Sequence, residues 1–189
     1  MNSGRVADLL SAERLSEGAR VHYSPDTRPD ELIFKLCDDG FWQDAITVAS
    51  CTLPPREAVW WACVCARKMA SIAENPAEML ALESAETWVY KPSEDHRKKA
   101  FEFAQASDPC RAGGLCAFAA TFNDCKIPLV DGSEVELDKG VFSGMVSGAV
   151  MMAASDAGPE QVFKRFKRFI ESAGDIANGG GGRMADMEE

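Results

Sequence analysis

The hydrophobic and polar positions of this chain follow helical spacing in eight segments. In the first segment, Pro29 suits the first helical position, apolar side chains recur at spacings of three and four, and Gly40 ends the pattern. Later segments are set off in the same way by prolines or by N-capping residues such as Asn75 and Ser93. The eight predicted helices cover approximately residues 29–39, 41–50, 54–68, 75–90, 93–107, 108–122, 139–154 and 159–176.

The pattern predicts an all-α protein with a single irregular multi-helix domain. Only residues 123–138 have strand character, and Pro128 and the Asp131-Gly132 pair favour a loop or a small hairpin there. No fixed-period repeat is present, which argues against a solenoid. We expect an N-terminal arm or short helix in residues 1–20, the helical domain in residues 21–174, and a flexible, disordered, glycine-rich acidic tail in residues 175–189.

The third helix is the most unusual segment, because residues 58–66 contain no charged or strongly polar side chain. A helix that is apolar on all sides is buried on most of them, so we expect this helix at the centre of the domain. Trp60 and Trp61 point about 100° apart on it. One of them can therefore be buried while the other reaches the surface as an anchor for a partner.

Charge narrows the classes of partner. The formal net charge of −10 disfavours binding to nucleic acid, whose phosphates are also negative. One basic cluster, Lys164, Arg165, Lys167 and Arg168, lies on the last helix, and we interpret it as a solvated face, with contact to an acidic partner as the alternative. The sequence shows no transmembrane segment and no signal peptide, so we expect a cytoplasmic protein without membrane insertion.

The seven cysteines are expected to be reduced thiols. Cys63 and Cys65 lie two positions apart on a helix, so their sulfurs diverge by about 200° and we interpret them as core residues. Cys110 precedes two glycines at a predicted helix start, and together with His96 it forms the one nucleophile–base pair that we consider. A small enzyme with a cysteine nucleophile, or a thiol-based redox sensor, is therefore the alternative hypothesis.

Other chemical signals are weak. Glu83 and Glu86 share one face of the fourth helix, which we interpret as solvated. The sequence contains no nucleotide-binding, metal-binding or hydrolase motif, and the glycine run near the C-terminus has neither a strand before it nor a helix after it. We therefore predict no catalytic residue, no metal and no cofactor.

The segment LPPREAVWWACVCAR, residues 53–67, together with the preceding Asp44-Ala45 pair, resembles a family of small bacterial proteins with the pattern LPxREAVWWAC-x-CAR. The motif covers about 15 residues, and a weaker helical pattern extends from Arg28 to Ala104. Members of this family are associated with type VI secretion gene clusters. The resemblance implies an accessory role, such as an adaptor or co-chaperone of a secretion effector, and it brings no catalytic residue with it.

These observations favour a non-catalytic protein-interaction module over an enzyme. We expect a protein partner, a secretion effector or adaptor, to contact aromatic side chains exposed on helix faces. Helical spacing on the last helix places apolar residues on one face, which is either core or a docking surface. The candidate contact residues are Trp42, Trp60, Trp61 and Phe166, and the apolar face of the last helix comprises Val162, Phe163, Phe166, Phe169 and Ile170.

Overall fold

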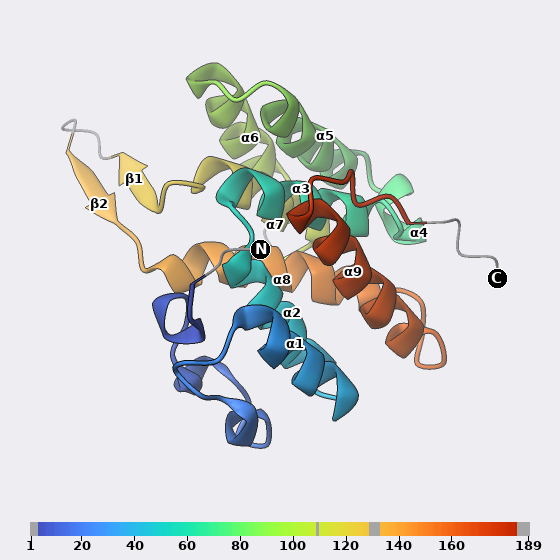
Figure 1. Ribbon diagram of the computed structural model, residues 1–189. Helices are drawn as coiled ribbons and strands as arrows, with labels where there is room; N and C mark the ends of the chain where they lie inside the picture. The colour runs from blue at the N-terminus through green and yellow to red at the C-terminus, as the bar shows by residue number, and fades with distance from the viewer. Residues whose placement is uncertain (1–3, 109, 129–132, 185–189) are drawn as a thin grey trace.

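The computed structural model describes residues 4–108, 110–128 and 133–184, and it confirms the all-α fold (Figure 1). Eight of the nine α-helices in these residues correspond to the eight predicted segments, and the additional α4 is a single turn between α3 and α5. Three short 3-10 helices precede α1. The α-helices are α1 (Pro29–Asp38), α2 (Trp42–Thr52), α3 (Pro55–Ala66), α4 (Ala70–Ala73), α5 (Pro76–Tyr90), α6 (Glu94–Ala106), α7 (Ala112–Thr121), α8 (Lys139–Ser155) and α9 (Val162–Ala177).

Several helix ends form where the sequence predicts them, whereas α7 begins at Ala112 and α9 at Val162, later than the predicted starts at residues 108 and 159. The Asn75 side chain accepts a hydrogen bond from the Glu78 N–H, and the Ser93 hydroxyl accepts one from the His96 N–H, so both residues cap their helices. Gly40 follows α1 with a φ of 82°, a left-handed conformation that costs glycine little.

Helix α3 lies at the centre of the domain, as its composition predicts (Figure 1). It packs against α5 and α7 in one direction and against α8 and α9 in another. Seven of its residues are buried, including Trp61, whose indole N–H donates to the Phe169 carbonyl of α9 at 2.8 Å. The apolar surface on several sides of α3 therefore holds the other helices together.

A second packing unit consists of α5, α6 and α7, which all contact one another. The N-termini of α5 and α7 meet at Glu78, whose carboxylate is buried and accepts a hydrogen bond from the Gly113 N–H at 3.3 Å. Arg111 lies 3.5 Å from the same carboxylate. Glu78 thus places a negative charge between two helix N-termini, where the helix dipoles favour it.

The N-terminal segment packs on the helical domain instead of extending away from it. Its 3-10 helices are η1 (Val6–Asp8), η2 (Ala12–Arg14) and η3 (Ala19–His22), and it buries Val6, Leu10, Leu15 and Ala19. The Asp44 carboxylate of α2 accepts hydrogen bonds from the Ser16 N–H at 2.7 Å and the Ser16 hydroxyl at 2.8 Å. These contacts hold the segment against the domain, with Val6, Leu10, Leu15 and Ala19 in the core.

Residues 126–128 and 134–136 form two paired strands, which agrees with the small hairpin that is one of the two structures predicted for this segment. Strands β1 (Lys126–Pro128) and β2 (Glu134–Glu136) pair antiparallel, with Ile127 opposite Val135. The hairpin extends from the helical body at the left of Figure 1, between the end of α7 and the start of α8.

The end of the described chain folds back on α9. Helix α9 reaches Ala177, beyond the predicted domain boundary at residue 174. Gly179 follows with a φ of 86°, and the Ser172 hydroxyl donates to the Gly182 carbonyl at 2.8 Å. Residues 178–184 therefore pack on the domain, whereas residues 185–189 of the predicted disordered tail lie outside the described residues.

Replacing Gly113 by alanine is expected to destabilise the protein by about 1–3 kcal/mol, because the added methyl group would overlap the Glu78 carbonyl oxygen. Gly144→Ala on α8 is the matched control, since a methyl group there meets no atom within 4 Å. We expect that variant to be as stable as the parent or more stable by about 0.5–1 kcal/mol. Urea unfolding followed by circular dichroism measures both, and equal stability of the two variants would contradict the packing argument.

Candidate functional site

The core thiols are buried. Cys63, Cys65 and Cys116 have no solvent exposure, which confirms the interpretation of Cys63 and Cys65 as core residues. Burial raises the pKa of Cys63 well above its ordinary value, and a hydrogen bond to the neighbouring Cys116 raises it further. Burial also raises the pKa of Cys65. These thiols are poor nucleophiles because the thiolate is the reactive form.

The structure does not bring Cys110 and His96 together as a nucleophile–base pair. His96 lies in the first turn of α6, and Cys110 follows the last turn of the same helix. The ten residue steps from His96 to Ala106 rise about 15 Å along the helix axis, far beyond hydrogen-bonding distance. The His96 Nδ1 atom instead lies 2.7 Å from the Lys91 carbonyl oxygen. Cys110 is exposed, and its N–H donates to the Asp108 carboxylate.

The paired carboxylates of α5 belong to an ion-pair network. Arg67 at the end of α3 donates to both carboxylate oxygens of Glu86, at 2.8 and 2.6 Å, and lies 3.9 Å from Glu83. The hydrogen bond to Glu86 is the main cause of a raised pKa at Arg67. Among the described residues, no group of three or more His, Cys, Asp or Glu side chains is placed to hold a metal ion.

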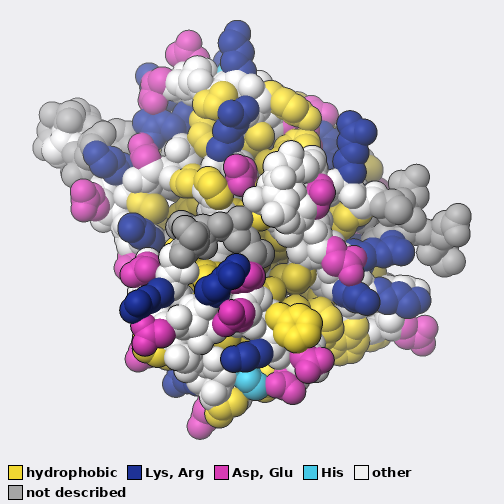
Figure 2. Space-filling view, in the orientation of Figure 1, with side chains coloured by type: hydrophobic (Ala, Val, Ile, Leu, Met, Phe, Trp, Pro, Cys, Tyr) yellow, Lys and Arg dark blue, Asp and Glu magenta, His cyan; other side chains and the backbone are white. Residues whose placement is uncertain are grey.

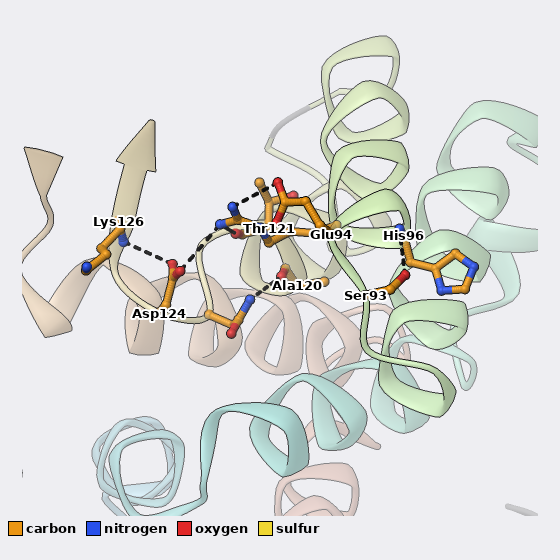
Figure 3. A network of polar contacts seen from close by, with 9 residues as sticks. Ser93, Glu94, His96, Ala120, Thr121, Asp124 and Lys126 are labelled. Carbon is orange, nitrogen blue, oxygen red and sulfur yellow. Dashed lines mark hydrogen bonds and ion pairs between the residues drawn. The ribbon is translucent and has the colours of Figure 1, made fainter. Parts of the chain in front are cut away.

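A polar network around Arg97 closes the end of α7 (Figure 3). The Arg97 guanidinium donates to the Glu94 carboxylate at 2.9 Å, to the Thr121 carbonyl at 3.4 Å and to the Asp124 carboxylate at 3.5 Å. A cation at this position is favourable because the C-terminus of a helix has a partial negative charge. Asp124 also accepts from the Lys126 N–H at 3.2 Å, so the same network orients the start of the hairpin.

An open cleft of about 730 Å³ lies next to this network. It forms where α2 and α9 end, where α3 and α8 begin, and where the segment from α7 to β1 passes η1. Its charged lining residues are Asp8, Glu57, Asp124 and Lys139. The cleft also exposes apolar atoms, so its surface suits a bound segment that has both apolar and hydrogen-bonding groups.

The four candidate contact residues have different environments. Trp61 and Phe166 are buried, at 0% and 5% exposure, and therefore offer no surface to a partner. Their burial has a physical reason, since both lie on the sides of α3 and α9 that face the other helices. Trp42 and Trp60 are half-buried and pack against the core with one side exposed.

Trp60 lies in an aromatic contact at the surface. Its ring meets Tyr90 of α5 edge to face, with 5.4 Å between the ring centroids. Its indole N–H donates to the Gly181 carbonyl at 3.0 Å, in the segment that follows α9. The tryptophan pair thus divides as predicted, with Trp61 in the core and Trp60 partly exposed.

Three aromatic residues outside the predicted set are much more exposed. Phe34 on α1 is 71% exposed, Tyr90 at the end of α5 is 70% exposed, and Phe163 on α9 is 61% exposed. The exposure of Phe34 could be predicted from helix geometry, because Phe34 points away from the apolar side of α1. The assignment of Phe163 to the apolar face of α9 is wrong, because Phe163 lies about 100° from the centre of the buried stripe.

Trp61→Ala is expected to destabilise the protein by about 3–5 kcal/mol, because it leaves a large cavity in the core. Trp60→Ala should cost only about 1–2 kcal/mol, since only part of the side chain is removed from water on folding. Thermal and urea unfolding of the two variants measure the difference. A smaller loss for Trp61→Ala than for Trp60→Ala would contradict the assignment of Trp61 to the core.

Alkylation of the native protein by iodoacetamide is expected to modify Cys110 first, because its thiol is the exposed one among the seven. Cys37 should react slowly at mildly alkaline pH, since burial raises its pKa to about 11 and leaves about one thiolate per thousand. Cys63, Cys65 and Cys116 should react only after unfolding. Peptide mass spectrometry against time resolves each site, and fast labelling of Cys63 in the folded protein would overturn this order.

None of the helices in the described part of the chain is long and apolar enough to cross a membrane.

Comparison with known proteins gives a family and no function. A family model described as a family of unknown function, DUF6931, matches residues 32–177, so the chain belongs to that family. No curated protein and no solved structure matches the chain.

Proposed function

We propose that this protein is a non-catalytic protein-interaction module that binds a protein partner through exposed aromatic side chains. The observation behind the proposal is the high exposure of Phe34, Tyr90 and Phe163 on three different helices. Large aromatic residues gain much free energy when a partner covers them, and they are enriched at interface hot spots. We therefore assign these three side chains to contact with the partner.

Figure 2 shows apolar side chains reaching the surface over α1 and the helices next to it. Helices α1 and α9 each pack against α2, so Phe34 and Phe163 come from elements joined to the same support. A rigid helical support presents such side chains with little loss of conformational entropy on binding.

The partner that we propose is a type VI secretion effector or its adaptor, met in the bacterial cytoplasm, with this protein as an accessory adaptor or co-chaperone. Support comes from the resemblance of residues 53–67 to the proteins of such gene clusters. Most of that motif forms α3, which is central and largely buried. The motif therefore explains the fold, whereas partner choice would reside in the exposed residues around it.

A cysteine enzyme is less well supported, because its proposed base and nucleophile lie at opposite ends of α6. The buried thiols also have raised pKa values, which lowers their reactivity toward substrates and oxidants alike.

Affinity capture of the tagged protein from its source bacterium tests the proposal. We expect one partner at near-equal amount, identified by mass spectrometry as a secretion effector or adaptor. Phe34→Ser, Tyr90→Ser and Phe163→Ser should leave the fold unchanged, since substitutions of exposed residues usually change stability by less than about 0.5 kcal/mol. At least one of them should reduce recovery by about tenfold or more.

Val21→Ser is the matched control, because Val21 is an exposed apolar residue that is not aromatic. It should capture the partner as well as the parent does. Absence of any stoichiometric partner, or equal recovery by all three aromatic variants, would overturn the proposed function.

A further inference from the structure

The exposed face of α9 combines an aromatic side chain with a cluster of cations. Phe163, Lys164 and Lys167 are exposed, and Arg168 is half-buried. On a helical projection these four residues span about 140°, on the side away from the buried stripe. Figure 2 shows Lys and Arg side chains gathered over the part of the molecule where α9 lies. A partner that reaches Phe163 therefore meets positive charge on the same face.

Arg165 differs from the other cations of this helix. Its guanidinium donates to the Ala153 carbonyl at 2.8 Å and lies 4.0 Å from the Asp156 carboxylate, so it joins α9 to the end of α8. Among the described residues, none of the salt bridges found involves Lys164, Lys167 or Arg168. Lys164 and Lys167 are exposed to solvent, and the half-buried Arg168 completes the cluster that an incoming anion meets.

The location of these charges is informative because the chain has a formal net charge of −10. An acidic surface repels acidic partners, so a local concentration of cations around Phe163 defines where an acidic segment can approach. Glu171, one turn further along α9, bounds the cluster on its C-terminal side.

We infer that the exposed face of α9 docks an acidic segment of a partner protein, with carboxylates pairing to Lys164, Lys167 and Arg168 and an apolar residue covering Phe163. This inference rests on the proposed function, and it assigns a position and a partner chemistry to one part of that function. The four residues named here are called the α9 face below.

An acidic protein segment fits the α9 face better than a membrane does. The apolar stripe of α9 is buried against α2, α3 and α8, so the helix has only Phe163 to insert among lipids. Nucleic acid is disfavoured because each of its nucleotides carries a charge along an extended backbone, which the net charge of −10 on the whole chain repels more strongly than a short acidic segment. Both remain measurable outcomes.

The probe is a synthetic, fluorescein-labelled helical peptide in which glutamates at i and i+4 flank leucines. Anisotropy at low ionic strength should show saturable binding, and added salt should weaken it by screening. The double variant Lys164→Glu and Lys167→Glu should weaken binding by about tenfold or more, since it replaces attraction by repulsion. Phe163→Ser should weaken binding with less change in the salt dependence.

Lys98→Glu with Lys99→Glu is the control, because it makes the same change in net charge at exposed lysines of α6. It should bind the peptide nearly as the parent does. Circular dichroism and thermal unfolding confirm that every variant is folded. Equal losses in the α6 and α9 double variants would overturn the inference, since only the net charge would then matter.

Absence of peptide binding, or tighter binding to phosphatidylglycerol vesicles or to duplex DNA than to the peptide, would also overturn the inference. The capture experiment keeps the two proposals apart. If the α9 double variant retains the natural partner, the inference about α9 fails and the interaction module stands. If the parent captures no partner, the proposed function fails.

Discussion

The fold depends on one constraint, which is that α3 is apolar on nearly all of its surface. Such a helix is stable in water only when other elements cover it in several directions. Helices α5 and α7 cover it from one direction, and α8 and α9 from another. The hydrogen bond from the Trp61 indole N–H to the Phe169 carbonyl restricts how α9 lies on α3. The indole N–H is buried, and it has its acceptor only in this placement of α9. The placement of these four helices follows from the need to surround α3, whereas α6 packs on α5 and α7, and α2 packs on α8 and α9 and carries α1.

Much of this architecture could be predicted from the sequence. Prolines, caps and Gly40 set the helix ends, and these are local signals that act within a few residues. The contact between Glu78 and Gly113 could not be predicted, because a buried carboxylate between two helix N-termini depends on tertiary packing. Exposure of Phe163 was also missed, since a phenylalanine next to an apolar stripe differs from a core residue only by its angle around the helix.

The residues of the candidate site were harder to predict from the sequence than the fold. Tryptophan is so often an interface anchor that Trp61 and Phe166 were natural choices, yet both are needed to fill the interior. The side chains that face solvent, Phe34 and Phe163, stand among residues of mixed character. These side chains are exposed because no other helix packs over them. That depends on the tertiary arrangement, which the residues next to them in the sequence do not determine. The recognisable motif and the surface available for recognition are consequently different parts of this molecule.

The N-terminal segment lies outside the residues that the family model matches, although it packs on them. The family match begins at residue 32, whereas Val6, Leu10 and Leu15 lie in the same continuous interior as the matched helices. A protein cropped to the matched residues would leave the Asp44 carboxylate without its two Ser16 donors and would uncover apolar side chains of α1 and α2. The region matched by the family model is thus smaller than the region that shares one continuous interior.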